Sequence, residues 1–320
     1  MSLSVRVWGA RGSLPRPHLP REIRDLVRQY QQSGAKLDAQ ALEQSFRQGA
    51  FGFGGNTPCV EVFAESKHLI IDAGSGIREL GYELMQGPCG QGQGEVHLFF
   101  THFHWDHILG LPFFVPIFVP GNTIHLYAVE PTVQTLITHL FQKPYFPVTD
   151  QALGAKIEVH LLQPRVPMSL GDMSITPYQL DHPDPCWGYR IESGGRVYAH
   201  CVDTEGVRVS RADLGPDLPL YQGVNLMIFD AQYTLAESME RVDWGHSSAL
   251  VGLDLAIQEQ VEKVVFMHFD PAATDAKIAL ARTDAERYLE SQVKSAKRSG
   301  APLSQVPQFE FAIEGETYQV

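Results

Sequence analysis

The chain has 320 residues, of which 44% are hydrophobic and 19% are charged. Its 25 lysines and arginines are outnumbered by 37 aspartates and glutamates, which gives a formal net charge of −12. This composition is typical of a folded globular protein, so it excludes a disordered, collagenous or coiled-coil chain. Such an acidic surface also disfavours broad binding to the phosphate backbone of a nucleic acid.

Signals for export or membrane insertion are not apparent. The N-terminal sequence MSLSVRVWGARGS contains no continuous apolar stretch of the kind found in signal peptides. The most apolar segment, Ile108–Pro120, is shorter than the roughly 20 residues that a membrane-spanning helix needs, and prolines interrupt it. The four cysteines form no CxxC pair. We therefore expect a cytoplasmic protein with free thiols and no membrane partner.

Short runs of apolar and β-branched residues predict strands along the whole chain. The predicted strands are Val5–Trp8, Val60–Phe63, Leu69–Asp72, Val96–Phe100, Ile124–Ala128, Ile157–Leu161, Ser174–Leu180, Tyr189–Glu192, Val197–Cys201, Leu226–Asp230, Val264–Met267 and Phe309–Ile313. Helical spacing of apolar residues predicts helices over Ile77–Leu84, Leu250–Ile257 and Ile278–Leu289. Strands in antiparallel-looking clusters with helices between them favour an α/β (α+β) protein whose sheets are covered by helices.

Residues 21–51 interrupt the early strands with two helical patterns. Apolar residues recur at helical spacing in both halves, and Ser33-Gly34 separates the two. We interpret this segment as a helical insertion, at about residues 16–50, packed on the surface of a single domain of residues 1–320. A substrate lid or a dimer contact is the alternative that the sequence leaves open.

Residues 101–107, THFHWDH, gather metal-binding side chains directly after a predicted strand. His102 and His104 are two positions apart, so on an extended backbone their side chains point to the same side. Asp106 and His107 follow where the chain begins to turn. Imidazole and carboxylate together suit Zn²⁺, with Mn²⁺ or Fe²⁺ as alternatives. Three histidines and an aspartate this close together predict a metal site rather than isolated core histidines.

The HxHxDH pattern resembles the signature of the metallo-β-lactamase superfamily. The flanking sequences FGGNTPCVEV (53–62), LIIDAGSGIREL (69–80) and HILGLPFF (107–114) are similar to its phosphodiesterase branch. That branch contains the tRNA-processing endonuclease RNase Z, phosphoribosyl cyclic phosphodiesterases and cyclic-nucleotide phosphodiesterases. The resemblance spans roughly residues 4–270, apart from the insertion. It implies a four-layer αββα sandwich with its active site at one edge of the two sheets.

The resemblance further implies two divalent metal ions held by seven side chains, with Asp203 shared between them. The first set is His102, His104, His182 and Asp203, and the second is Asp106, His107, His268 and the same Asp203. Asp181 remains a rival of Asp203, and both His182 and His268 could instead serve only the fold. Asp72, in IDAGSG, is expected to orient a ligand histidine through its other ring nitrogen.

A second pair of residues matches the RNase Z-like branch. Asp230 ends a predicted strand, and His246 lies in WGHSS at the start of a helix, where those enzymes carry an acidic residue and a histidine that act on the scissile phosphate and leaving group. The acidic residue is an aspartate here, in place of the glutamate usual in RNase Z. An imidazolium backed by a carboxylate could neutralise a phosphoryl oxygen or protonate a leaving oxygen. A purely structural histidine near a helix N-terminus is the alternative.

The resulting hypothesis is a dinuclear metal-dependent phosphodiesterase, with zinc best suited, in which a metal-bridging hydroxide attacks a small phosphodiester such as a cyclic nucleotide. His246 and Asp230 would assist the leaving group, and Asp106 would serve both as ligand and in catalysis. Nucleic acid is disfavoured as a partner, and a homodimer is left open. The alternatives are an RNase Z-like RNA endonuclease, a lactam, thioester or sulfate-ester hydrolase, and a non-enzymatic binding protein stabilised by its metals.

Overall fold

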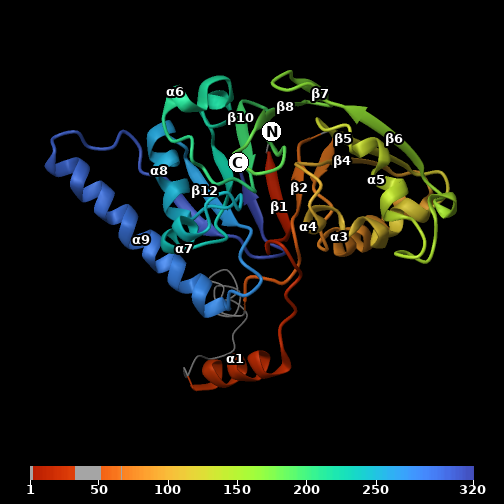
Figure 1. Cartoon of the computed structure of the whole chain (residues 1–320), viewed down its shortest axis with the longest axis horizontal. Coiled ribbons are helices and arrows are strands. Elements are labelled where there is room, and N and C mark those ends of the chain that lie inside the picture. The colour runs from red at the N-terminus through yellow and green to blue at the C-terminus, as the bar shows by residue number, and fades with distance from the viewer. Residues whose placement is uncertain (1–2, 33–51, 66) are drawn as a thin grey trace.

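The computed structural model describes residues 3–32, 52–65 and 67–320. Its strands form two seven-stranded sheets with helices on their outer sides (Figure 1). The first sheet, in the order β14-β1-β2-β3-β4-β5-β6, contains β1 (Ser4–Gly9), β2 (Cys59–Phe63), β3 (His68–Ile71), β4 (Glu95–Phe99), β5 (Thr123–Ala128), β6 (Lys156–Leu161) and β14 (Thr317–Gln319). The second, in the order β13-β12-β11-β10-β9-β8-β7, contains β7 (Met168–Leu170), β8 (Met173–Gln179), β9 (Trp187–Ser193), β10 (Arg196–Cys201), β11 (Leu226–Asp230), β12 (Lys263–Met267) and β13 (Gln308–Phe311).

The α-helices are α1 (Pro20–Gln32), α3 (Ile77–Leu84), α4 (Trp105–Ile108), α5 (Val133–Leu140), α6 (Arg211–Leu214), α7 (Leu235–Glu240), α8 (Ala249–Glu259) and α9 (Asp275–Arg298). Short 3-10 helices are η1 (Pro88–Gln91), η2 (Leu111–Phe113), η3 (Val115–Phe118), η4 (Asp150–Ala152) and η5 (Gly215–Leu220). None of these described helices combines the length and the apolar character needed to cross a bilayer.

Two hydrophobic cores explain the layers. The core between the sheets contains Val5 and Ile71 of the first sheet together with Ile175 and Tyr189 of the second, all buried. The opposite face of the first sheet packs in a separate core under α3 and α5, and α8 covers β11 and β12 of the second sheet with α9 outside it (Figure 1). Both sheets therefore bury both faces, and the expected four-layer αββα arrangement is confirmed.

Every strand predicted from the sequence is confirmed, as are the helices α3, α8 and α9. The prediction missed β7 and β14, which are three residues long, too short for an alternating pattern to be recognised. It also missed α5. All four cysteines are buried free thiols, as expected.

Helix α1 accounts for the first half of the predicted insertion and lies apart from both sheets (Figure 1). Ile23 and Val27, on its predicted apolar face, keep 51% and 47% of their surface exposed. The first helical pattern is therefore real, but these two side chains are not packed into the core. The second helical pattern, within residues 33–51, falls outside the described part of the chain.

The carboxyl ends of parallel strands from both sheets meet at one edge of the sandwich. Strands β3 to β6 run parallel in the first sheet, and β10 to β13 run parallel in the second. The segment after β1 runs beside the segment after β12, where Gly12 N donates to Phe269 O at 2.9 Å and Phe269 N donates to Ala10 O at 2.9 Å. Ligand sites in α/β proteins occur at such carboxyl ends.

Candidate metal centre

All nine predicted site residues lie together at this edge, because each is in or just beyond a strand end or a loop that faces it. Residues 102–107 follow β4, and His182 follows β8. Asp203 follows β10, Asp230 is the last residue of β11, and His268 directly follows β12. His246 lies in the loop before α8, with its ring 5.8 Å from that of His182.

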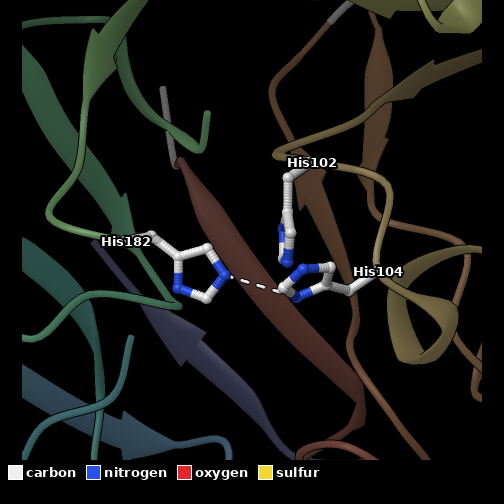
Figure 2. Close-up of side chains that lie close together, drawn as sticks. All are labelled: His102, His104 and His182. Atoms are coloured by element: carbon white, nitrogen blue, oxygen red, sulfur yellow. Dashed lines mark hydrogen bonds between the residues drawn. The ribbon is translucent and has the colours of Figure 1, made fainter. Parts of the chain in front are cut away.

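A first cluster consists of three histidines whose rings point toward one another (Figure 2). His182 Nε2 lies 3.3 Å from His104 Nδ1, and two ligands of a tetrahedral zinc ion are about 3.4 Å apart when each bond is about 2.1 Å. The remaining ring nitrogens face other partners: His182 Nδ1 contacts the Gly245 carbonyl at 3.2 Å, and His104 Nε2 contacts Asp184 at 2.8 Å. Together with His102, these rings can present three lone pairs to one ion.

A second cluster lies next to the first and contains two carboxylates and two imidazoles. His268 Nε2 is 3.2 Å from both Asp106 Oδ2 and Asp203 Oδ2. His107 Nε2 is 3.5 Å from Asp106 Oδ2 and 2.9 Å from Asp203 Oδ2. These four atoms surround one point at distances that suit a second ion. Asp203 also belongs to a group with His102 and His107, so its carboxylate lies between the two clusters.

Several buried polar atoms in these clusters fit a metal better than they fit a hydrogen-bond network. His102 Nε2 is buried and has no hydrogen-bond partner within the described chain, and His107 Nε2 and Asp203 Oδ2, although 2.9 Å apart, are buried without a well-directed hydrogen bond. Leaving such an atom unpaired costs about 1–3 kcal/mol, more when the group is charged. A divalent cation would satisfy all three through their lone pairs, so the residues present fit the metal chemistry that the motif predicts.

Asp72 is the buried carboxylate that orients this part of the site. Its Oδ2 lies 2.8 Å from His107 Nδ1 and accepts a hydrogen bond from Thr101 Oγ1 at 2.8 Å, while its Oδ1 accepts from the Thr101 backbone at 2.8 Å. The contact with a histidine ring nitrogen that the sequence predicts is therefore confirmed. It fixes the ring so that His107 Nε2 faces the second cluster.

Burial and charge also set the protonation of the clusters. Burial, with neighbouring His107 adding to it, lowers the pKa of His102 well below its usual value, so its imidazole is neutral. Burial alone would raise the pKa of Asp203, but His268 and His107 outweigh it and hold that pKa well below its usual range. Burial lowers the pKa of His107, but Asp203, Asp106 and Asp72 outweigh it and raise that pKa well above its usual value. Neutral imidazoles and ionised carboxylates are the forms that bind metals, so binding of an ion would release the proton of His107.

Asp230 and His246 form a hydrogen-bonded pair beside the second cluster. His246 Nδ1 lies 2.9 Å from Asp230 Oδ2 and 3.6 Å from Asp203 Oδ1. Asp230 Oδ1 accepts hydrogen bonds from the backbone of Gln232 at 2.9 Å and of Ser247 at 3.1 Å, which fixes the carboxylate. Burial lowers the pKa of His246, but Asp230 outweighs it and raises that pKa to about 9.

Three site residues adopt a left-handed backbone conformation just past a strand end. The φ angles of Asp72, Asp203 and His268 are +64°, +62° and +67°. Non-glycine residues pay roughly 1–3 kcal/mol for such conformations, which persist where the surrounding structure holds them and which cluster at functional sites. Here the left-handed conformation turns the chain after β3, β10 and β12, and the side chains of Asp72, Asp203 and His268 then point toward the site.

The sequence analysis did not identify two glycines against which the rings of His182 and His268 pack. A Cβ on Gly245, whose φ is +85°, would lie 1.9 Å from His182 Nδ1, and a Cβ on Gly12 would lie 2.4 Å from His268 Nδ1. Each ring therefore packs directly on a glycine backbone. The motif WGHSS contains Gly245, but a glycine in a sequence does not reveal what lies against it.

Two further contacts refine the predicted site. The Ser13 backbone donates to Asp106 Oδ2 at 2.6 Å, a contact from the loop after β1 that carries no sequence signal. Asp181, the rival of Asp203, instead accepts a hydrogen bond from the Arg208 backbone at 3.0 Å and pairs with its guanidinium. Of the two carboxylates, the structure places Asp203 among the clustered histidines.

A sequence profile for the beta-lactamase superfamily domain matches residues 67–269, more than half of the chain. The chain belongs to the beta-lactamase superfamily. Ribonuclease Z of Clostridium perfringens is 23% identical to it over 286 residues, which cover 71% of this chain and 89% of that protein. The 3′,5′-cyclic-nucleotide phosphodiesterase of Schizosaccharomyces pombe is 22% identical over 213 residues, 62% of this chain and 60% of that protein.

Solved structures of the superfamily share the fold. Zn²⁺-bound PqqB from Methylobacterium extorquens aligns with a TM-score of 0.64 at 15% sequence identity, over 99% of this chain and 100% of that one. These findings confirm the superfamily and its RNase Z and phosphodiesterase-like branch. The protein is accordingly a metal-dependent hydrolase, and its histidine and aspartate clusters could hold the divalent ions that this superfamily fold implies.

Two cavities flank the centre of this superfamily hydrolase. One, of about 480 Å³, is lined by residues that include the cluster histidine His182 together with Asp181 and Arg208. The other, of about 500 Å³, is lined by residues that include Arg16, His18, Asn56, Ser75, Arg78 and Phe113. Both volumes fall in the range of roughly 300–1,000 Å³ that is typical of small-molecule sites.

Proposed function

We propose that the protein is a dinuclear, zinc-type phosphodiesterase that acts on a small phosphodiester such as a cyclic nucleotide. The observation that carries the proposal is the hydrogen-bonded pair Asp230–His246, which lies beside two clusters of metal-ligand side chains. A metal site alone would suit any hydrolase of the fold. A carboxylate-held histidine next to it suits departure of an alkoxide from phosphorus.

The two clusters would divide the ligands between two ions. One ion would be held by His102, His104 and His182, and the other by Asp106, His107 and His268. Asp203 would contribute to both. Ions bound in this way lower the pKa of a water molecule and polarise a phosphoryl oxygen. Asp72, Gly245 and Ser13 would keep the ligand atoms aimed at the ions.

His246 would supply the proton that the leaving group needs. Its Nδ1 is occupied by Asp230, so Nε2 is the atom available to a substrate. In the imidazolium form, this atom would hydrogen-bond the leaving oxygen and transfer its proton as the bond to phosphorus breaks. Asp230 would keep its charge throughout and hold the ring in place, since its other oxygen is bound by two backbone N–H groups.

The cavity lined by Arg16 and Arg78 supports a small anionic substrate. Arg16 Nη2 pairs with Glu22 at 2.8 Å, whereas its buried Nη1 has no hydrogen-bond partner in the described residues. An unpaired guanidinium donor of this kind suits a phosphate or a nucleobase oxygen. The cavity volume of about 500 Å³ is that of a single nucleotide rather than of a folded RNA.

An RNase Z-like RNA endonuclease is the second candidate, because ribonucleases Z from several organisms are among the relatives. The reaction at phosphorus would be the same, and the substrates would differ in size. Metal charge, rather than a basic surface, would have to attract the RNA, given a net charge of −12.

Substrate comparison separates the two candidates. Zinc-loaded protein should hydrolyse bis(p-nitrophenyl) phosphate, and its kcat/KM should be higher for a 3′,5′-cyclic nucleotide than for a tRNA precursor with a 3′ trailer. The reverse order would establish the RNA endonuclease. No turnover of any phosphodiester by protein that still binds its metals would overturn both candidates and point to another ester class or to a binding protein.

Leaving-group dependence tests His246. The substitution His246→Ala should lower kcat at least ~10²-fold for a cyclic nucleotide, whose alkoxide needs a proton, and less for bis(p-nitrophenyl) phosphate, whose phenolate does not. His139→Ala, which removes an exposed histidine on α5, is the matched control and should leave both rates unchanged. Equal losses on both substrates would contradict the proton-donor role.

A further inference from the structure

A second group of histidines and carboxylates lies at the other end of the first sheet. Its members are Glu95 and His97 of β4, His125 of β5, and Glu158 and His160 of β6. These strands are parallel, and Glu95 begins β4 while His97 and His125 lie at the middle of their strands, whereas the candidate metal centre follows the carboxyl end of β4. None of these residues has a role in the proposed reaction.

Strand register places these side chains side by side. His97 pairs with His125 across β4 and β5, and His125 pairs with Glu158 across β5 and β6. Paired residues on neighbouring strands project from the same face of a sheet. The rings of His97 and His125 stack with their centroids 4.7 Å apart.

Three ligand atoms of the group converge around one point. Glu95 Oε1 lies 3.3 Å from His125 Nε2 and 3.8 Å from His97 Nε2. Two ligands of a tetrahedral zinc ion are about 3.4 Å apart. These separations match those within the candidate metal centre, and the three residues can each offer a ligand atom within 4.8 Å of the others.

His97 gives an independent indication of a ligand. Its side chain is only 4% exposed, and its buried Nε2 has no hydrogen-bond partner among the residues described. The other ring nitrogen, Nδ1, lies 3.1 Å from the Tyr127 hydroxyl. Burial, with the neighbouring His125 adding to it, lowers the pKa of His97 to about 4, so at neutral pH this imidazole has a free lone pair rather than a charge.

The remaining atoms of the group are already held by other residues. His125 Nδ1 lies 3.0 Å from His160 Nε2 and 3.3 Å from Glu158 Oε2, which leaves His125 Nε2 for Glu95 and the common point. Glu95 Oε2 accepts from Lys67 Nζ at 2.5 Å, which leaves Oε1. Ligand histidines in metal sites characteristically have their second ring nitrogen bound in this way.

We propose that Glu95, His97 and His125 form a second, separate binding site for a divalent transition-metal ion such as Zn²⁺. Two imidazoles and a carboxylate are three ligands for such an ion, and water completes a tetrahedral set. Half of the Glu95 side chain is exposed, so an ion can enter from solvent. Bound there, the ion links β4 to β5 far from the reacting atoms and stabilises the sheet rather than the reaction.

Metal stoichiometry tests this site without depending on the catalytic centre. Metal-free full-length protein is titrated with Zn²⁺ by equilibrium dialysis, alongside the variants Glu95→Gln and His125→Asn. Each variant should bind one equivalent fewer than the wild type at a Zn²⁺ concentration that just fills the wild-type site. Removing an outer partner of a ligand already weakens binding about 10- to 100-fold, and losing one of three ligands should weaken it at least as much. Hydrolysis of bis(p-nitrophenyl) phosphate should stay within about twofold of the wild-type rate.

Two further measurements keep the outcome unambiguous. His139→Asn, an exposed histidine on α5, should bind as many equivalents as the wild type. Circular dichroism checks that the Glu95 variant, altered at a half-exposed side chain, is folded. Equal stoichiometry in wild type and folded variants would overturn the proposal, as would the loss of an equivalent in His139→Asn, because that would indicate unspecific imidazole binding.

Discussion

At the level of single residues, the candidate metal centre depends on groups that bind its histidines from behind. Asp72 contacts His107 Nδ1, and the Gly245 carbonyl contacts His182 Nδ1. Each contact uses one ring nitrogen and leaves the other for a ligand. Such partners typically change metal affinity 10- to 100-fold when removed. Substituting these partners tests the centre more specifically than substituting the proposed ligands, because it changes the orientation of a histidine ring and leaves the number of ligands unchanged.

Gly245→Ala should displace His182. The new methyl group would lie 1.9 Å from His182 Nδ1. Because this atom belongs to a rigid ring, the whole ring must move, and its contact with the Gly245 carbonyl is lost. Zn²⁺ affinity at one site should fall roughly 10- to 100-fold, as measured by competition with a chelating dye.

Gly223→Ala is the matched control, because Gly223 also has a positive φ, +62°, but has no atom within 4 Å of the added methyl group in the described structure. It carries the same kind of backbone strain without the clash. If both variants lose zinc equally, strain rather than contact with His182 is responsible.

Glu314 provides a test of stability against pH. Its carboxylate accepts hydrogen bonds from Asn56, yet burial raises its pKa to about 7 from a usual value of 4.5. Because the folded-state pKa is raised, the protonated acid stabilises the fold fully below pH 4.5, and this contribution is lost as the pH rises through 7. The rise corresponds to at most roughly 3.4 kcal/mol.

Glu314→Gln should remove that dependence. Urea unfolding at pH 5 and pH 8 should show the free energy of unfolding falling more steeply with pH in the wild type than in the variant. Glu290→Gln, an exposed position on α9, should follow the wild type. Parallel pH profiles for Glu314→Gln and wild type would show that the carboxyl titrates normally.

At the level of elements, strand prediction succeeded because most strands carry β-branched residues with a buried face. The same residue types hid one of the helices. Helix α5 has apolar Val133 and Leu136 at helical spacing, but Thr135, Ile137 and Thr138 are β-branched and obscure the pattern. Val133 and Leu136 are buried, and their tertiary packing stabilises the helical conformation of this segment.

Helix α8 packs on its sheet through a glycine. A Cβ at Gly252 would lie 2.7 Å from ring atoms of both Phe229 in β11 and Phe266 in β12. Both rings are fully buried and cannot give way cheaply, so Gly252→Ala should push the helix outward and lower the free energy of unfolding by about 1–3 kcal/mol, measured by urea denaturation.

Gly87→Ala is the control for that prediction. Its added methyl group would meet only the Leu84 carbonyl oxygen, at an ordinary 3.6 Å. Its stability should remain within about 0.5 kcal/mol of the wild type. A Gly252→Ala protein as stable as wild type would mean that α8 is not fixed on the sheet by this contact, since alanine otherwise favours a helix.

At the level of the whole molecule, part of the site could be predicted from local sequence and part could not. His102, His104, Asp106 and His107 are close in sequence, so their spacing alone indicated a metal. His182, Asp203 and His268 are single residues whose convergence is produced by the packing of two sheets, and only the family resemblance pointed to them. The Gly12 contact with His268 arises from that same packing, whereas the Ser13 contact with Asp106 joins two loops of the first sheet. The sequence offered no sign of either.

The same packing predicts how metal affects stability. His107 and Asp106 belong to the first sheet's loops, whereas Asp203 and His268 belong to the second. The Nε2 atom of each histidine lies within 3.5 Å of an oxygen of each carboxylate. An ion bound by all four therefore joins the two halves of the fold. A ligand present at about 100 times its Kd stabilises the native state by ~2.7 kcal/mol.

Removing the metal with a chelator should therefore lower Tm by about 5 °C for a chain of this size, and adding Zn²⁺ should restore it. In His268→Ala the Zn²⁺-dependent rise should shrink, because one ligand from the second sheet is missing. In Glu95→Gln most of the rise should remain, because only one of the three proposed ions is lost. A wild-type Tm that is the same with and without metal would show that the ion does not hold the two sheets together. The buried polar atoms of the centre would then be satisfied in another way.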